Sequence, residues 1–179
     1  VISMRRRLRE LIAYFGGKVI HPVLGLPGGV SKGLKPDDLP GFKQLAEDGV
    51  EFAKFTLQVF KDIVLKNPDY VKLITSDTYT HKTYYMGMVD AQNRVNFYDG
   101  QIRVVDPTGK EYAKFPVQKY LDYVGEHVEP WRYVKFCYLK PLGWKGFVDG
   151  PESSVYSVAP LARLNAADAM ATPEAQKAR

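Results

Sequence analysis

Apolar residues recur at helical spacing in two stretches of the first 67 residues. Residues 3–15 place leucines, an isoleucine and a phenylalanine on one face and arginines on the other, and Gly16-Gly17 follows at once. This pattern predicts an amphipathic helix that ends at a glycine cap. A longer apolar stripe over residues 42–64, between Asp37-Asp38 and Asn67-Pro68, predicts a helix roughly 40 Å long at 1.5 Å per residue. The stripe lacks coiled-coil flanking charges, so we expect it to pack within a larger helical body.

After residue 68 the pattern changes to short β-prone runs separated by turn residues. Four runs predict an antiparallel meander: 83–89, 95–98, 101–105 and 111–115. Residues 117–127 suit a short helix, 133–139 another strand, and 168–174 the start of a further helix. The predicted fold class is α+β, in which long helices pack with the meander. Its predicted parts are 1–67, 68–165 and 166–179, with Trp131, Phe136 and Trp144 as core or interface aromatics.

Composition narrows the class of protein only in part. A hydrophobic content of 45% excludes a disordered tail. The net charge of +5 is a modest excess that could favour an acidic partner but lies within the range of ordinary soluble proteins. A single cysteine cannot form an internal disulfide. Because we find no membrane-spanning run and no signal peptide, we expect a cytoplasmic protein with no membrane partner.

The segment between the two predicted helices is rich in glycine. Residues 16–33 hold six glycines and two prolines, which predicts a loop with several fixed or left-handed backbone angles. His21 lies in this loop, which Pro22 and Pro27 stiffen, so its imidazole can keep one orientation. From the residues alone, His21 either locks the loop through a hydrogen bond to a carbonyl or tunes a neighbouring functional group.

Two phrases carry a family resemblance. The first is Gly-Gly-Lys-Val-Ile-His-Pro at 16–22 with Pro-Gly-Gly-Val-Ser-Lys at 27–32, and the second is Val-Ala-Pro-Leu-Ala-Arg-Leu-Asn at 158–165. In their wording and order they resemble the large subunit of nickel-iron hydrogenases, and most closely its cytosolic multisubunit type. That family binds its metals through two Cys-x-x-Cys pairs. This chain has only Cys137, and both of its ends look cut, so the resemblance implies a central fragment.

The resemblance implies a function for the parent protein and roles for five residues. The parent would oxidise dihydrogen reversibly at a nickel-iron centre and pass electrons to a soluble acceptor through an iron-sulfur small subunit, with further electron-transfer subunits as partners. The fragment would be inactive and free of cofactor, and we expect it to self-associate. His21 would tune the centre without ligating metal. The other residues implied to lie near the site or an interface are Pro22, Gly28, Gly29 and Arg163.

Two alternatives compete with this interpretation. The Pro-Gly-Gly-Val phrase also resembles the quinone-binding subunit of respiratory complex I, which belongs to the same superfamily. The arginines at 5, 6, 7 and 9 could instead mark a basic binding module. No stacking platform accompanies them, so we expect a solvated or partner-facing helix and no nucleic acid partner.

The sequence also departs from the family wording at two positions, Arg132 and Ala159. A glycine is usual at position 159, and a positive φ there would strain alanine.

Residues outside these motifs give no metal site. His21, His81 and His127 lie in separate segments without ligand spacing. We expect His127 at a helix C-terminus and Cys137 as a partly buried structural thiol on a strand.

Overall fold

The computed structural model describes residues 1–179, with the side chain of Tyr79 excepted. The chain divides into two compact units, Val1–Thr75 and Ser76–Arg179. Each unit is described by itself.

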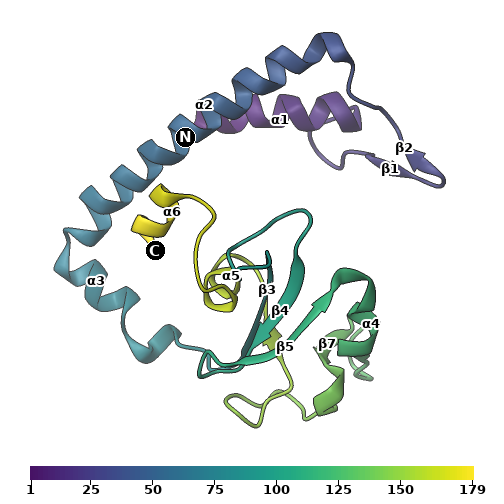
Figure 1. The fold of residues 1–179 in the computed structure, drawn as a ribbon, viewed down its shortest axis with the longest axis vertical. Helices are drawn as coiled ribbons and strands as arrows, with labels where there is room; N and C mark the ends of the chain where they lie inside the picture. The colour runs from purple at the N-terminus through teal and green to yellow at the C-terminus, as the bar shows by residue number, and fades with distance from the viewer. The chain divides into compact units, whose positions relative to one another are not determined.

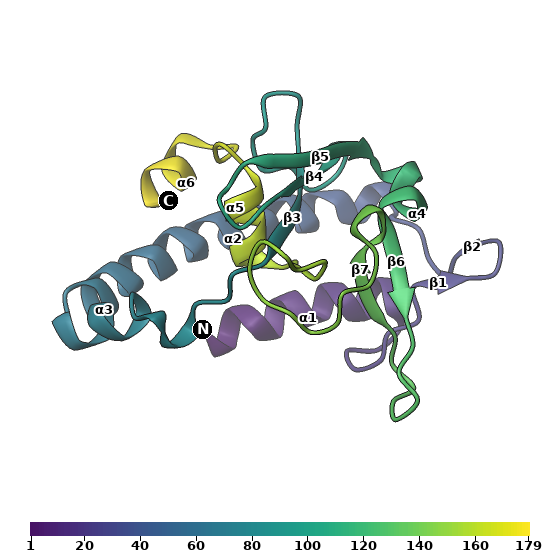
Figure 2. The same ribbon diagram turned by 90° about the horizontal axis from the view of Figure 1, so that it is seen from below.

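The first unit is built on two helices that lie side by side (Figures 1 and 2). Helix α1 (Ile2–Gly16) ends as predicted at a glycine: Gly17 has φ 76° and its N–H donates to the Ala13 carbonyl. Helix α2 (Leu39–Val59) continues into a π-helical segment, Phe60–Leu65, which confirms one long helical stretch. Between α1 and α2 lie two short strands, β1 (Gly25–Leu26) and β2 (Gly29–Val30). Helix α3 (Pro68–Ile74), which the sequence patterns did not predict, is capped by the Asn67 side chain.

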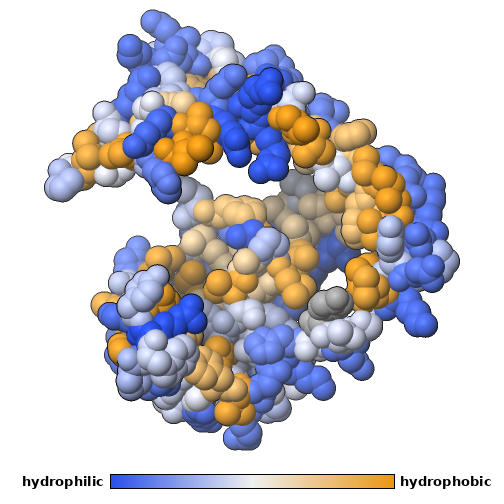
Figure 3. All heavy atoms as spheres, turned by 180° about the vertical axis from the view of Figure 1, so that it is seen from behind, coloured by the Kyte–Doolittle hydropathy of each residue, from blue (hydrophilic) through white to orange (hydrophobic). Residues whose placement is uncertain are grey.

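Few side chains of this unit are buried within it. Met4 is buried against α2, near Gly49, whereas no residue of α2 is fully buried. Apolar residues stand among hydrophilic ones on the helical surface (Figure 3), and several stay largely exposed: Val50, Phe55 and Ile63. The apolar stripe of α2 is therefore only partly covered by α1.

The second unit is organised by a four-stranded sheet in the order β5-β4-β3-β8. Strands β3 (Tyr84–Val89), β4 (Gln101–Val105) and β5 (Glu111–Pro116) form the predicted antiparallel meander, and β8 (Tyr156–Ser157) pairs in parallel with β3. Helix α5 (Pro160–Ala166) packs against β3, as Figures 1 and 2 show. The main core cluster contains Tyr84, Val104, Phe115 and Leu139.

Two sequence predictions for this unit need correction. The predicted strand at 95–98 is reduced to a single bridge between Val89 and Val95. The Asn96 side chain accepts from the N–H groups of Tyr98 and Asp99 and so turns the chain away from the sheet. The predicted helix at 117–127 stops at Tyr123, the end of α4 (Tyr120–Tyr123), which a short 3-10 turn precedes.

Residues that follow α4 belong instead to a hairpin. Strand β6 (Val124–His127) pairs with β7 (Phe136–Leu139), which is the shorter, observed form of the strand predicted at 133–139. Gly125 leaves room for the Tyr138 ring, since a Cβ there would lie 2.7 Å from it. The final helix, α6 (Pro173–Ala178), is capped by Thr172.

Candidate functional site

The glycine-rich loop is tied down by Ser31. Its hydroxyl lies 2.6 Å from the Val23 carbonyl and 3.1 Å from the Phe15 carbonyl, and its N–H donates to the Leu24 carbonyl. The Val23 N–H in turn donates to the carbonyl of Gly16. These bonds fasten both ends of the loop to the C-terminus of α1. Ser31 belongs to the second half of the loop motif, but the sequence patterns predicted no role for it.

Pro22 and Gly16 meet closely inside this loop. A Cβ built on Gly16 would collide with the Pro22 ring, so only glycine permits this approach. Gly28 has φ 89° and follows Pro27 in the turn between β1 and β2, while Gly29 begins β2 and pairs with Leu26. A proline followed by a residue of positive φ is the preferred pair for a type II turn. The predicted left-handed angle in this segment is therefore confirmed at Gly17 and Gly28.

His21 is exposed and has φ 52°. Within the part of the chain that the structure describes, its ring forms no hydrogen bond or ion pair, so it does not lock the loop. Ser31 does so instead. His21 lies in the first unit and Arg163 in the second, and the structure does not define the position of one residue relative to the other.

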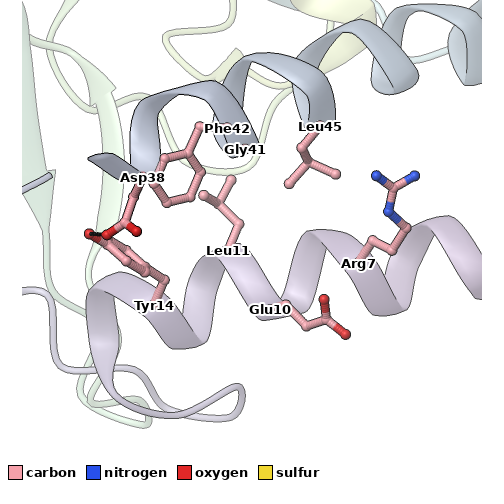
Figure 4. A pocket seen from close by; sticks show the side chains of 8 residues that line it. All are labelled: Arg7, Glu10, Leu11, Tyr14, Asp38, Gly41, Phe42 and Leu45. Atoms are coloured by element: carbon pink, nitrogen blue, oxygen red, sulfur yellow. Dashed lines mark hydrogen bonds between the residues drawn. The ribbon is translucent and has the colours of Figure 1, made fainter. Parts of the chain in front are cut away.

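A pocket of about 310 Å³ lies between α1 and α2 (Figure 4), and the sequence patterns did not predict it. Leu11, Phe42 and Leu45 give it an apolar centre. At one end the Tyr14 hydroxyl donates to Asp38 at 2.6 Å, which raises the pKa of Tyr14, and at the other end lies Arg7.

Two carboxylates, Asp38 in the pocket and Asp48 outside it, link residues of α1 to the second helical segment. Arg7 pairs with Asp48 at 2.6 Å and, with Gln44, lowers the pKa of that carboxyl group. Asp38 occupies the N-cap position of α2, but its carboxylate accepts from Tyr14 instead of capping the helix.

Arg163 lines a second pocket, of about 260 Å³, in the sheet unit. Its guanidinium carbon lies 4.6 Å from the centre of the Phe97 ring, a cation-π geometry. Ala159, at the N-cap of α5, has φ 84° and ψ −170°, which alanine rarely adopts. The positive φ anticipated at this position is therefore present, although the residue is alanine. The remaining lining residues are mainly apolar: Met86, Gly87, Met88, Asn96, Ile102 and Val158.

Arg103 also fixes α5 against the sheet. It exposes 8% of its side chain, pairs with Glu111 at 2.7 Å and with Asp168 at 2.8 Å, and donates to the Ala166 carbonyl at 3.1 Å. Hydrogen bonds from Arg103 and from Asn93 lower the pKa of Asp168. The local sequence did not indicate the cluster of Arg103, Glu111 and Asp168, because these residues come from three separated segments.

The residues singled out on the hairpin differ from expectation. His127 ends strand β6 and not a helix; it pairs with Glu129 at 2.9 Å and stacks on Trp144. Cys137 is exposed and not partly buried. Trp131, Phe136 and Trp144 do gather in one aromatic cluster, with Phe147 as a further member.

The described residues form no cluster of potential metal ligands. Across residues 1–179, Tyr79 side chain excepted, no group of three or more His, Cys, Asp or Glu could hold a metal ion. Among the same residues, no helix is both long and apolar enough to cross a bilayer.

Comparison with known proteins gives the class of the relatives. The chain is 47% identical over all 179 residues to the F420-non-reducing hydrogenase iron-sulfur subunit of Archaeoglobus profundus. It is similar to hydrogenase subunits. The F420-non-reducing hydrogenase vhu subunit of Methanocaldococcus jannaschii is 38% identical over 99% of the chain, and the NAD-reducing hydrogenase HoxS subunit beta of Cupriavidus necator is 30% identical over 99%.

The chain spans well under half the length of these relatives, namely 37%, 40% and 36% of them respectively. A solved structure is also similar: a crystal structure of an NAD+-reducing [NiFe]-hydrogenase in the H2-reduced state has a TM-score of 0.72 and 25% identity. That match covers 98% of this chain and 37% of the other. No protein-family profile matches the chain.

These relatives correct the assignment made from the motifs. We expected the central segment of a nickel-iron large subunit, but the relative from Archaeoglobus profundus, matched along the whole chain, is named as an iron-sulfur subunit. That name contradicts the assignment to the large subunit, together with the function attached to it. We also withdraw the basic binding module and the complex I subunit, since the relatives named above are all hydrogenase subunits. Two expectations are retained: the relatives are hydrogenase subunits, and the fold class is α+β.

Proposed function

We propose that the chain is a segment of an electron-transfer subunit in a multisubunit hydrogenase and that its glycine loop is a contact surface for a neighbouring subunit. The observation that carries the first part is similarity along the whole chain to named hydrogenase subunits. The oxidoreductase activity would belong to the assembled complex.

The names of the relatives also bear on the choice of electron acceptor. Their names divide between F420-non-reducing and NAD-reducing enzymes, yet both kinds align with nearly all of this chain. The shared segment therefore serves a role common to both kinds, and we infer that other parts of the complex choose the electron acceptor.

The loop supports the second part of the proposal by its surface and its rigidity. Ile20, Val23, Leu26 and Val30 are largely exposed, although Ser31 holds the backbone in place. A rigid apolar surface binds a partner at low entropic cost. Pro22, Gly28 and Gly29 shape this surface, and His21 presents an imidazole on it that forms no hydrogen bond or ion pair with the described residues.

A matched pair of variants in the longer protein, produced with its partner subunits, tests the loop. His21→Asn keeps a residue that tolerates φ 52° and removes the imidazole, whereas Lys18→Ala changes an exposed neighbour. We expect His21→Asn to lower hydrogen-dependent reduction of a viologen dye, or to weaken assembly in size-exclusion chromatography. Lys18→Ala should change neither property.

Gly28→Ala supplies a second test, because alanine at φ 89° costs about 1 kcal/mol of backbone strain and distorts the turn. Unchanged assembly and activity in both loop variants would refute the contact surface. The similarity to hydrogenase subunits would be unaffected by that result.

A further inference from the structure

The hollow around Arg163 combines one cation with apolar walls. Arg163 is the sole charged side chain among the described residues that line it, and it is half-buried. Within the described part of the chain, its guanidinium has no carboxylate or carbonyl acceptor, although it carries five N–H donors. A guanidinium in this setting is less well hydrated than one on an open surface and gains more from an anionic partner.

Several features of the backbone hold Arg163 in this place. Gly87 lets α5 approach β3, since a Cβ there would lie 3.1 Å from the Arg163 Cα. Arg103 anchors the C-terminal end of α5 through the Ala166 carbonyl, and strained Ala159 sets its start. Such strain persists where the surrounding structure fixes it, often at binding sites.

The size of the surrounding surface points to a peptide and not to a small ion. Phe97 is 73% exposed and Val158 59% exposed, and both line the pocket. A bare oxyanion would pair with the guanidinium and leave this rim in water. A peptide with apolar residues beside a carboxylate would cover both.

We propose that this pocket binds an acidic side chain of a partner polypeptide, with the carboxylate on Arg163 and flanking apolar residues on the rim. The planar guanidinium forms paired hydrogen bonds with a carboxylate, which selects glutamate or aspartate over a neutral amide. This inference goes beyond the proposed function, and its test requires no hydrogenase activity.

Methionine methyl groups allow a direct test on the chain itself. Met86 and Met88 line the pocket, whereas the other two of the four methionines, Met4 and Met170, do not line it and serve as internal controls. The probe peptides are acetyl-Leu-Glu-Leu-amide and its glutamine counterpart, titrated into protein carrying 13C-methyl methionine. We expect saturable shifts of the Met86 and Met88 signals, with the glutamate peptide binding about tenfold more tightly.

Variants and a competing ion define the outcomes. Arg163→Met should abolish the preference for glutamate over glutamine, and Arg163→Lys should keep part of it. If Arg163→Met fails to fold, Arg163→Lys and the two peptides on the unaltered chain still decide the matter. Equal binding of both peptides, no shift up to the solubility limit, or the same shifts with inorganic phosphate would overturn the proposal. So would shifts of Met86 and Met88 on raising protein concentration alone, which would indicate a second copy as the occupant.

Discussion

Ala159 offers a sharp test of the backbone at the start of α5. Its φ of 84° with ψ −170° lies in a region that glycine occupies freely and alanine does not. Replacing it with glycine removes strain of order 1–3 kcal/mol, while the greater freedom of glycine in the unfolded chain costs roughly 0.5–1 kcal/mol. The side chain is exposed, so little packing is lost. The expected net gain is about 1 kcal/mol.

The assay can be confined to the second unit. Both tryptophans, Trp131 and Trp144, lie in Ser76–Arg179, so tryptophan fluorescence reports this unit alone. For a unit of roughly 100 residues, a gain of about 1 kcal/mol raises the midpoint of thermal unfolding by roughly 4–8 °C.

Ala91→Gly is the matched control, because Ala91 is exposed in a turn without a positive φ. It should leave stability unchanged or lower it slightly. If Ala159→Gly lowered the midpoint as much as Ala91→Gly, the inferred strain at Ala159 would be wrong.

Four further results are expected. Gly87→Ala should destabilise the second unit by about 1–3 kcal/mol in urea unfolding, because its Cβ would meet the Arg163 Cα at 3.1 Å, whereas Gly33→Ala, in open space, should be tolerated. Hydrogen bonding to Arg103 lowers the pKa of Asp168 in the folded chain. The ionised Asp168 carboxylate therefore stabilises the fold above its unfolded pKa of about 3.9, and this stabilisation is lost as pH falls through the lower folded pKa. The urea midpoint should therefore drop below about pH 4, and less steeply in Asp168→Asn; parallel acid profiles would contradict this. Elemental analysis of the untagged chain should find no stoichiometric nickel or iron, and one tightly held metal per chain would contradict this expectation. Light scattering should give a mass above 20.2 kDa that rises with concentration, because α2 exposes apolar side chains such as Phe55; a monomer at high concentration would oppose this.

Local patterns were enough to predict several elements. The glycine after α1, the long stripe of α2 and the alternation in β3, β4 and β5 each concern residues close in sequence. The motif wording also led to the hydrogenases, the class of the relatives. It did not lead to the subunit for which the relative from Archaeoglobus profundus is named, because resemblance in two short phrases does not specify which polypeptide of a complex carries them.

Other features depend on partners distant in sequence. Residues 124–127 form a strand because residues 136–139 supply its hydrogen bonds, which outweighs the helical pattern before them. Glu111 and Asp168 reach Arg103 only through the fold.

The pocket at Arg163 likewise combines features that the sequence indicated with features that depend on the tertiary structure. Sequence alone identified Arg163 and the unusual alanine at 159 as notable residues. The approach of α5 to β3 at Gly87, and the placing of Phe97 under the guanidinium, came only with tertiary structure. Helices and turns are determined by neighbouring residues, whereas a pocket is determined by surfaces that long-range packing brings together.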